Sequence, residues 1–403
     1  FTVDPFNNLS HATTYKIRVT SGVKDSAGNT LNSQYETSDG FSTMFVLQFG
    51  TYSSEYGYGV AVDNSSNIYV TGYTAGGLDG NTNVGNEDIF LIKYNSSGTK
   101  QWTRQFGTTS KEIGEDVVVD SSNNIYITGQ TNGDLDNISN SGWSDIFLVK
   151  YDSSGTKQWT QLLGTTSNDF AYGVTVDNSS NIYLTGYTTS VFDNTSAIGG
   201  RDTFLVKYDS NGSKLWTQQF GSTLNDYGRG VTVDSSNNIY VTGYTKGVLD
   251  NNTSSGSDDI FLAKFNSSGT KQWTQQIGTS SADYGRGVAV DSSDNIYVTG
   301  VTSGGLDGNS NAGGNDPLSD IFLVKYNSSG TKLWTRQMGS SSYDSAWGIA
   351  VDNSSNIYVT GYTAGVFDGN STSGSYDLFL IKYNSSGTKQ WSRTLGSATQ
   401  DLA

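Results

Sequence analysis

Cysteine is absent from this chain of 403 residues, and histidine occurs once, at His11. The lack of cysteine excludes disulfide bonds, thiolate catalysis and cysteine-ligated zinc. The single histidine lies outside the repeats described below, so no Ser-His, Cys-His or histidine-metal constellation can be assembled within them. These residue types favour a protein that is not an enzyme.

Proline, basic charge and long apolar runs are scarce as well. The chain has 2 prolines, 49 glycines and a formal net charge of -15. The acidic balance argues against nucleic acid as a partner, and no apolar run is long enough for a membrane-spanning segment. Short runs of Val, Ile, Tyr and Phe are separated by Asn, Ser, Gly and Asp, which is typical of an all-β protein.

One stretch recurs throughout the chain. It reads Val-Asp-Asn-Ser-Ser-Asn-Ile-Tyr-Val-Thr-Gly-Tyr-Thr at residues 62–74 and returns in five further versions. A second signature, Phe-Leu-x-Lys-Tyr followed by Gly-Thr-Lys-Gln-Trp, follows the same period of 57 residues, with one spacing of 61. A fixed period indicates units that bury their apolar faces against their neighbours. The tryptophans of this signature are Trp102, Trp159, Trp216, Trp273, Trp334 and Trp391.

Each repeat contains four candidate strands, which in the first repeat are residues 59–63, 67–74, 88–94 and 101–107. The first is short and built of small residues, as a crowded axis requires. The third is apolar on both faces and must be covered on both sides. The fourth alternates Trp102, Arg104 and Phe106 with polar residues, which fits an outer strand with one wet face. Four-stranded sheets ordered in this way predict a β-propeller.

The number of blades follows from both ends of the array. Residues 45–50 match the fourth strand of a repeat, because they precede residues 102–107 by the period, and Asp401 follows Asp344 by the same interval. Since a fourth strand from one end can complete a blade begun at the other, we predict a seven-bladed ring with one blade incomplete. A six-bladed ring with a spare strand is the alternative.

The repeat motifs resemble those of the bacterial β-propeller repeat family called SBBP, over residues 45–403. Residues 1–44 depart from the repeat; a strand-like run at residues 14–19, Gly-Val-Lys-Asp-Ser-Ala-Gly-Asn at 22–29 and Phe-Ser-Thr at 41–43 resemble the C-terminal half of bacterial Ig-like domains. The resemblance implies a partial Ig-like β segment followed by a propeller, in a secreted or surface-attached protein. It supplies no shared catalytic residues.

One position just before the first conserved Val or Ile of each repeat differs between repeats whose neighbours barely change. In a propeller this position would reach the rim of the central channel, on the face that also carries the loops between the second and third strands. Binding residues usually sit on loops held by a rigid scaffold, and aromatic and Arg side chains are common anchors. The alternative is that large side chains only fill the channel. The candidate binding residues are Tyr58, Glu115, Tyr172, Arg229, Arg286 and Trp347, with Trp143 and Arg201 from the loops.

The loops between the second and third strands are rich in oxygen donors. Asp and Asn at alternate positions suit a hard cation such as calcium, although the loops lack the closing Glu of an EF-hand. Ordinary loop turns are the alternative, and no other cofactor is expected. The candidate calcium ligands are Asp79, Asn81, Asn83, Asp307, Asn309 and Asn311.

Taken together, these features predict a non-enzymatic extracellular or cell-surface protein that acts in adhesion or assembly. Its partner would be a protein or glycan at the cell surface, met by the variable face, or another copy of the chain. A structural subunit of a surface layer or filament is one alternative. A polysaccharide-acting enzyme with a carboxylate pair drawn from Glu115, Asp79 and Glu87 is the other.

Overall fold

The computed structural model describes residues 48–397, except 194, 196–197, 314–318 and 373, together with four short N-terminal strands. These are β1 (Thr14–Tyr15), β2 (Arg18–Val19), β3 (Tyr35–Glu36) and β4 (Phe41–Ser42), with β1 paired to β4 and β2 to β3. The rest of the expected Ig-like segment, including His11, lies outside the described residues.

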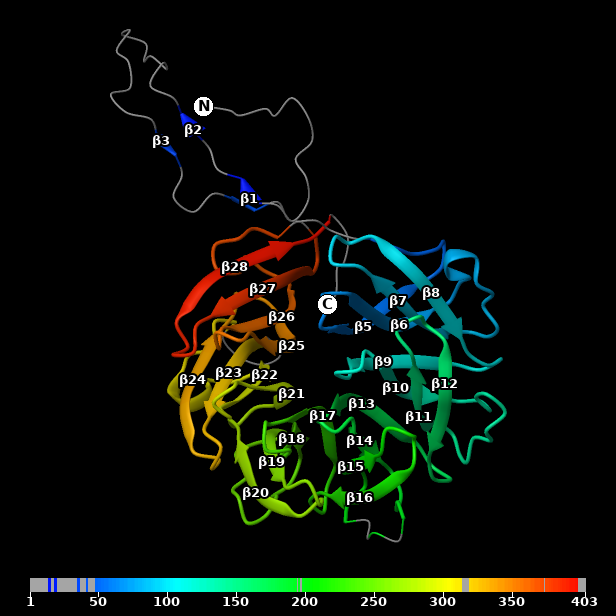
Figure 1. Ribbon diagram of the computed structural model, residues 1–403. Coiled ribbons are helices and arrows are strands. Elements are labelled where there is room, and N and C mark those ends of the chain that lie inside the picture. Colours follow the sequence, from blue (N-terminus) through cyan, green and yellow to red (C-terminus); the bar gives the residue numbers. More distant parts are fainter. Residues whose placement is uncertain are drawn as a thin grey trace.

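Six four-stranded antiparallel sheets stand around a central axis as the blades of a propeller (Figure 1). In every sheet the strands are paired in chain order, with the first strand nearest the axis (Figure 1). The blades are β5 (Glu55–Val62), β6 (Ile68–Thr74), β7 (Asp88–Tyr94) and β8 (Lys100–Phe106); β9 (Glu112–Val119), β10 (Ile125–Thr131), β11 (Asp145–Tyr151) and β12 (Lys157–Leu163); β13 (Asp169–Val176), β14 (Ile182–Thr188), β15 (Asp202–Tyr208) and β16 (Lys214–Phe220); β17 (Asp226–Val233), β18 (Ile239–Thr245), β19 (Asp259–Phe265) and β20 (Lys271–Ile277); β21 (Asp283–Val290), β22 (Ile296–Thr302), β23 (Asp320–Tyr326) and β24 (Lys332–Met338); and β25 (Asp344–Val351), β26 (Ile357–Thr363), β27 (Asp377–Tyr383) and β28 (Lys389–Leu395).

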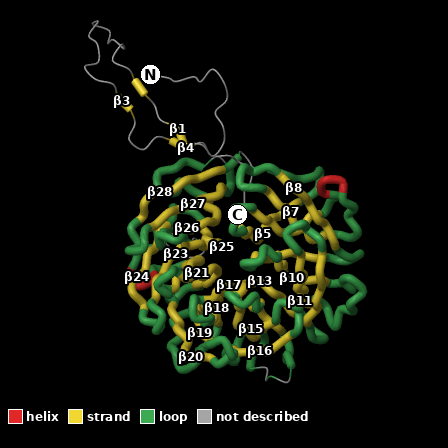
Figure 2. Tube along the Cα trace, in the orientation of Figure 1, coloured by secondary structure: helices red, strands yellow, loops and turns green. Residues whose placement is uncertain are grey.

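The predicted order of strands from axis to rim is confirmed. The third strand of the first blade has its predicted bounds, whereas the first strand begins four residues earlier than expected, at Glu55. Two 3-10 turns, η1 (Leu78–Gly80) and η2 (Leu306–Gly308), are the helices of the described residues (Figure 2). Within that part of the chain, no helix is long and apolar enough to cross a membrane.

The hydrophobic core lies between the blades. Ile89 and Leu91 of β7 pack with Val117 and Ile127 of the second blade, and Phe90 on the opposite face of β7 is also fully buried. Burial on both faces of the third strand confirms the sequence interpretation. Each such side chain contributes about 1.5–3 kcal/mol by leaving water, so packing between blades is a major source of the stability of the propeller.

The turn after each first strand is closed by the Asp of the recurring Val-Asp pair. Asp120 Oδ1 accepts hydrogen bonds from the backbone N–H groups of Ser122 and Asn124, both at 2.9 Å. Its Oδ2 accepts from Asn124 Nδ2 at 2.9 Å and from the buried Tyr126 hydroxyl at 3.1 Å. This carboxylate therefore caps an Asx turn.

The described residues form six blades, so the predicted incomplete seventh blade is not among their sheets. Residues 45–47 of the expected extra strand lie outside the described residues, and Gln48–Gly50 are not part of a strand. The physical reason is that a single strand without a hydrogen-bonding neighbour forms no sheet. The first and sixth blades each keep one sheet face that is exposed to solvent. Val60 on β5 is 66% exposed and Leu380 on β27 is 39% exposed.

Candidate functional site

The innermost strand of every blade contains a β-bulge, and the variable residue is the one left unpaired. In the fourth blade, for example, Gly228 pairs with Gly243 and Gly230 with Thr242, so Arg229 between them has no partner on β18. A bulge re-aims a side chain, and it places these residues within the first strand, which begins earlier than the sequence predicted. The six bulge residues, called the axial residues below, are Tyr58, Glu115, Tyr172, Arg229, Arg286 and Trp347.

The backbones of neighbouring inner strands approach closely beside the bulges. A Cβ added at Gly230 would lie 2.7 Å from the carbonyl oxygen of Arg286 in the next blade. A Cβ at Gly173 would lie 3.1 Å from the carbonyl oxygen of Arg229. Glycine after the axial residue therefore lets adjacent blades bring their axial side chains together.

The axial residues contact one another across blade boundaries. The guanidinium carbon of Arg229 lies 4.0 Å from the ring centroid of Tyr172 in the preceding blade, and its Nη2 donates to the Tyr244 hydroxyl at 3.1 Å. The guanidinium carbon of Arg286 lies 3.7 Å from the ring centroid of Trp347 in the following blade. Such stacking is the cation–π geometry, so residues predicted separately form one cluster.

The variable loop residue Arg201 joins the same side of the propeller. Its guanidinium lies beside the contacting rings of Tyr187 and Tyr227, 5.5 and 5.4 Å from their centroids, and donates a hydrogen bond to the Tyr227 hydroxyl. Trp143, the other loop residue predicted to take part, is 75% exposed. The structure thus places Arg201 against the rings of Tyr187 and Tyr227 and leaves the Trp143 side chain exposed to solvent.

A tier of paired aromatic rings supports the axial residues and was missed from the sequence. The residue two positions before the axial residue pairs with the residue that follows Thr-Gly in the second strand, and both are aromatic in the first, third and fourth blades. Tyr227 stacks on Tyr244 with centroids 4.6 Å apart, and Phe170 stacks on Tyr187 at 5.0 Å. The recurrence of Tyr before the glycine and again in Thr-Gly-Tyr-Thr was the signal that could have revealed this tier.

Two adjacent carboxyl groups in the second blade stand out electrostatically. Burial raises the pKa of Glu115 to about 7, although nearby Arg229 opposes the shift. Burial likewise raises the pKa of Asp116 to about 7, against hydrogen bonds that favour its ionised form. Asp116 stands where most blades have glycine, and its Oδ2 accepts from the Val174 N–H of the third blade at 2.9 Å. Asp79 was one of the three acids considered for a catalytic carboxylate pair. It lies in η1 and pairs with Lys100 on the outer strand.

Buried Asp or Glu residues at the start of the first and third strands were also not predicted from the sequence. Asp226 on β17 and Asp202 on β15 of the preceding blade are essentially buried, and a Cβ at Gly221 would touch both carboxyl groups. Burial raises the pKa of Asp226 to about 6, and neighbouring Asp202 adds to the shift. Asp in the same place in every third strand was the available sequence signal. Ser222 N–H donates to Asp226 at 2.7 Å, so this acid also closes the linker between blades.

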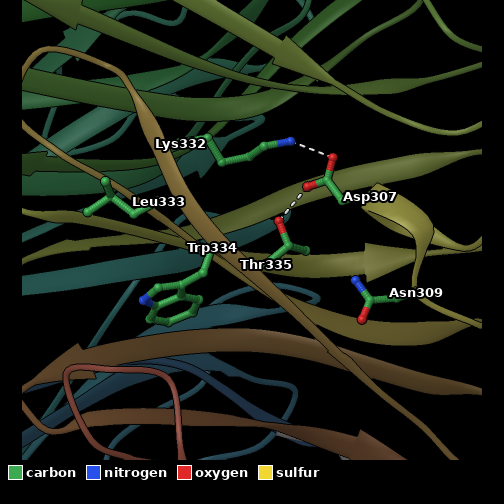
Figure 3. Close-up of a pocket in the computed structure, with 6 residues that line it drawn as sticks. All are labelled: Asp307, Asn309, Lys332, Leu333, Trp334 and Thr335. Atoms are coloured by element: carbon green, nitrogen blue, oxygen red, sulfur yellow. Dashed lines mark hydrogen bonds and ion pairs between the residues drawn. The ribbon is translucent and has the colours of Figure 1, made fainter.

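The candidate calcium ligands lie on the outer loops, where lysine occupies their carboxylates (Figure 3). Asp307, at a positive φ of 53°, accepts hydrogen bonds from the Lys332 ammonium and the Thr335 hydroxyl (Figure 3). Asn309 donates through Nδ2 to the Leu306 carbonyl at 2.7 Å. Asp79 and Asn81 repeat these contacts with Lys100, Thr103 and Leu78, and Asn83 donates to two backbone carbonyls.

These contacts form a clamp between an outer loop and an outer strand and occupy the carboxylates of Asp79 and Asp307. Asn311, the counterpart of Asn83, instead accepts through its Oδ1 from the Gly313 N–H at 2.9 Å. In the described ranges of the chain, no three acidic, His or Cys side chains gather where they could hold a metal ion.

The repeats match a protein-family model described as a beta-propeller repeat, SBBP. The matched segments, residues 45–79, 101–136, 158–193, 215–250, 272–307 and 333–368, together cover more than half of the chain. The chain belongs to the SBBP beta-propeller repeat family. Residues 1–49 match a second family, the bacterial Ig-like domain Big_5. Both resemblances inferred from the sequence are thereby confirmed.

Two curated proteins share part of this SBBP sequence. An uncharacterized WD repeat-containing protein of Acanthamoeba polyphaga mimivirus is 24% identical over 469 aligned residues, covering 86% of this chain and 34% of that protein. The regulatory protein FlaEY of Caulobacter vibrioides is 27% identical over 208 residues, covering 46% of this chain and 22% of that protein. The chain spans about a third or less of these relatives.

Solved propeller structures are similar at low sequence identity. A catalytically inactive virginiamycin B lyase from Staphylococcus aureus aligns with a TM-score of 0.46 and 11% identity, over 87% of each chain. A gluconolactonase from Xanthomonas campestris gives a TM-score of 0.41 and 10% identity, over 76% of this chain and 83% of the enzyme. A Bacteroides caccae protein of unknown function gives 0.42 and 10%, over 76% and 89%.

Proposed function

We propose that this SBBP propeller is a non-enzymatic binding module of an extracellular or cell-surface protein, and that its axial residues hold a carboxylate-bearing saccharide. The observation that carries the proposal is the variable bulge. Six repeats that are otherwise nearly alike place Tyr, Glu, Tyr, Arg, Arg and Trp at one unpaired position. Variation confined to a point where side chains converge is what a specific ligand would require.

The chemistry of the cluster suits an acidic sugar. The faces of Tyr172 and Trp347 can stack on pyranose rings, and guanidinium groups bind carboxylates through paired hydrogen bonds. Arg229 and Arg286 form a local positive centre in a chain whose formal net charge is -15. Because burial raises the pKa of Glu115 to about 7, this residue is partly protonated near neutral pH and repels an anionic ligand less than an ordinary Glu would.

An adhesive role at the bacterial surface is part of the same proposal. The adjoining match to a bacterial Ig-like domain supports it, as does a surface rich in Asn, Ser and Thr, which can take part in many weak polar contacts with a glycan. The absence of a shared catalytic motif among the repeats supports a role in binding rather than in catalysis.

Binding of oligogalacturonate to the purified chain tests the proposal by calorimetry. We expect the combined variant Arg229→Ala, Arg286→Ala, Trp347→Ala to lose binding while its far-ultraviolet circular dichroism is unchanged. A neutral glucan of equal length should bind more weakly than the uronate to the unmodified chain.

Arg336→Ala provides a matched control, because Arg336 stacks on Trp334 at 5.1 Å on the outer strand, away from the axis. It should bind the uronate like the unmodified chain. Undiminished binding by the axial triple variant would overturn the proposal, and so would a surface protein partner that binds at the axial residues while the uronate does not.

A further inference from the structure

A belt of buried acidic residues passes through the blades. In the fourth blade, Asp226 of β17 and Asp259 of β19 pair with Thr245 of β18 from its two sides, and all three residues are fully buried. The first and third strands of the other blades begin in the same way. The belt acids, each at most 1% exposed, are Asp88, Glu112, Asp145, Asp169, Asp202, Asp226, Asp259, Asp283, Asp320, Asp344 and Asp377.

Five blade boundaries each bring two belt acids together. The backbone N–H of Asp226 donates at 2.8 Å to the carbonyl of Arg201, the residue directly before Asp202. A Cβ added at the linker glycine Gly221 would lie 2.6 Å from Asp226 Oδ2 and 2.8 Å from Asp202 Oδ1, so the two carboxyl groups meet beside this glycine. The same backbone hydrogen bond at every boundary defines the pairs Asp88–Glu112, Asp145–Asp169, Asp202–Asp226, Asp259–Asp283 and Asp320–Asp344.

No basic side chain forms an ion pair with these ten acids among the residues that the structure describes. The ion pairs found there join lysines to other acids, as Lys214 of β16 joins Asp193. Arg201 directly precedes Asp202, yet its guanidinium lies against two tyrosine rings. Burying two adjacent carboxylates without a cation is unfavourable, because both lose their hydration and their charges repel.

The groups that face the pair Asp202–Asp226 are uncharged donors and further belt acids. Gln219 Nε2 donates to Asp202 Oδ2 at 2.8 Å, and the Ser222 N–H donates to Asp226 Oδ2 at 2.7 Å. The belt continues on the two sides to Asp169, beyond Thr188, and to Asp259, beyond Thr245. These surroundings supply hydrogen bonds and leave the negative charge uncompensated.

One oxygen in most pairs also lacks a hydrogen-bond donor. Asp88 Oδ1 and Glu112 Oε2 would lie 2.4 and 2.8 Å from a Cβ added at Gly107, and Glu112 Oε2 accepts from the Thr108 N–H at 2.6 Å. Asp88 Oδ1 is buried and finds no donor in the described part of the chain. An ionised carboxylate only accepts, whereas a protonated one donates, so a proton on Asp88 would supply the missing hydrogen bond toward Glu112. The other third-strand acids with such an orphaned Oδ1 are Asp145, Asp259 and Asp320.

We propose that each of the five carboxyl pairs holds one shared proton in mild acid, and that this makes the contact between blades pH-sensitive, firmer in acid and weaker at alkaline pH. The electrostatics support it. Burial raises the pKa of Asp226 to about 6, and neighbouring Asp202 adds to the shift. Burial likewise raises the pKa of Asp344 to about 6, with Asp320 adding to it. Because the folded protein holds these protons more tightly than the unfolded chain, their contribution to stability is lost as the pH rises through about 6.

Infrared spectroscopy at pH 5.5 tests for the shared proton, because a protonated carboxyl group has a C=O stretching band that a carboxylate lacks. We expect Asp202→Asn and Asp226→Asn each to weaken this band, and the double variant to weaken it no further, since both acids share one proton. Undiminished intensity in both single variants would overturn the proposal. A double variant that loses the sum of the two single losses would show that each acid holds its own proton, which also contradicts it.

Asp152→Asn is the matched control. Hydrogen bonds, first from Ser154, lower the pKa of Asp152 in its outer hairpin, so it carries no proton at pH 5.5. Asparagine already stands at this place in four other blades, as Asn95, Asn266, Asn327 and Asn384. The variant should leave the band unchanged.

Thermal melts test the consequence for the blades. On going from pH 5 to pH 8, the Tm of Asp226→Asn should rise by several degrees relative to the unmodified chain, because the amide cannot become charged. The Tm of Asp152→Asn relative to the unmodified chain should be the same at both pH values. A relative Tm of Asp226→Asn that does not change with pH would contradict the pH-sensitive contact.

Proton uptake on refolding gives a readout that requires no variant. When the unmodified chain is diluted from urea into unbuffered solution at pH 6, we expect a net uptake of more than two protons per chain. Glu115 and Asp116, whose pKa values burial raises to about 7, account for at most two. Uptake of two or fewer would overturn the proposal. None of these measurements requires a saccharide, so they succeed or fail independently of the proposed function.

Discussion

The guanidinium of Arg286 is stacked on the indole of Trp347, 3.7 Å from ring centroid to guanidinium carbon, across the boundary between the fifth and sixth blades. Burial and the nearby positive charge of Arg229 lower the pKa of Arg286 to about 10, which still leaves it charged at neutral pH. The indole face is thus one of the groups that hold this cation beside the axis.

Removing that aromatic partner should cost stability. We expect Trp347→Ala to lower the free energy of unfolding by about 1–2 kcal/mol, because a partly desolvated cation–π contact of that size is lost together with apolar packing. Urea denaturation monitored by circular dichroism measures the change. Trp143→Ala is the control, since Trp143 is 75% exposed and its removal should change stability by less than about 0.5 kcal/mol. Equal losses in both variants would contradict the prediction.

The raised pKa of Glu115 predicts a pH dependence. Because the folded protein holds the proton more tightly than the unfolded chain, this residue favours folding most at low pH, and its contribution is lost as pH rises through about 7. Glu115→Gln should therefore be more stable than the unmodified chain at pH 8, by at most about 3 kcal/mol, and at pH 5 by only about 1 kcal/mol. Thermal melts at the two pH values decide this. A stability difference that is the same at both would show that Glu115 titrates normally.

The Asx turns predict a difference between blades. Asp120→Ala removes four hydrogen-bond acceptor contacts and leaves the buried Tyr126 hydroxyl without its partner, so we expect a loss of about 1–3 kcal/mol. Asp352→Ala removes the same contacts in the sixth blade, where Tyr358 is only partly buried and water can replace the carboxylate. Its loss should be smaller, as chemical denaturation of both variants would reveal.

The outer-loop clamps predict the response to calcium. Because the Asp79 and Asp307 carboxylates are bound by Lys100 and Lys332, millimolar CaCl₂ should not raise the Tm and EDTA should not lower it. Lys332→Met should lower the Tm slightly, since a partly exposed ion pair contributes at most about 1 kcal/mol. A rise of several degrees in calcium would support the cation site that the alternating Asp and Asn residues suggested.

Several features could be read from the sequence because they are encoded in the residue pattern of a single repeat. The period, the four strands, the two-sided burial of the third strand and the Asp63-type turns follow from local alternation and from hydrogen bonds between residues at most six apart. The variable positions were found by comparing repeats with one another, and the structure places all six at equivalent bulges.

Other features were decided only by tertiary structure, since they arise between strands and loops that are distant from each other in the sequence. The bulge that turns Arg229 toward Tyr172 is a property of the pairing between two strands, and their contact crosses a blade boundary. Lys100 forms an ion pair with Asp79 because the outer strand lies beside η1. The alternation of Asp and Asn in the loop does not reveal this contact. The repeat sequence specifies the residues of each blade. The exposure of Val62 and Leu380 depends instead on how far the six twisted sheets extend around the axis, which is set by the packing of one blade against the next.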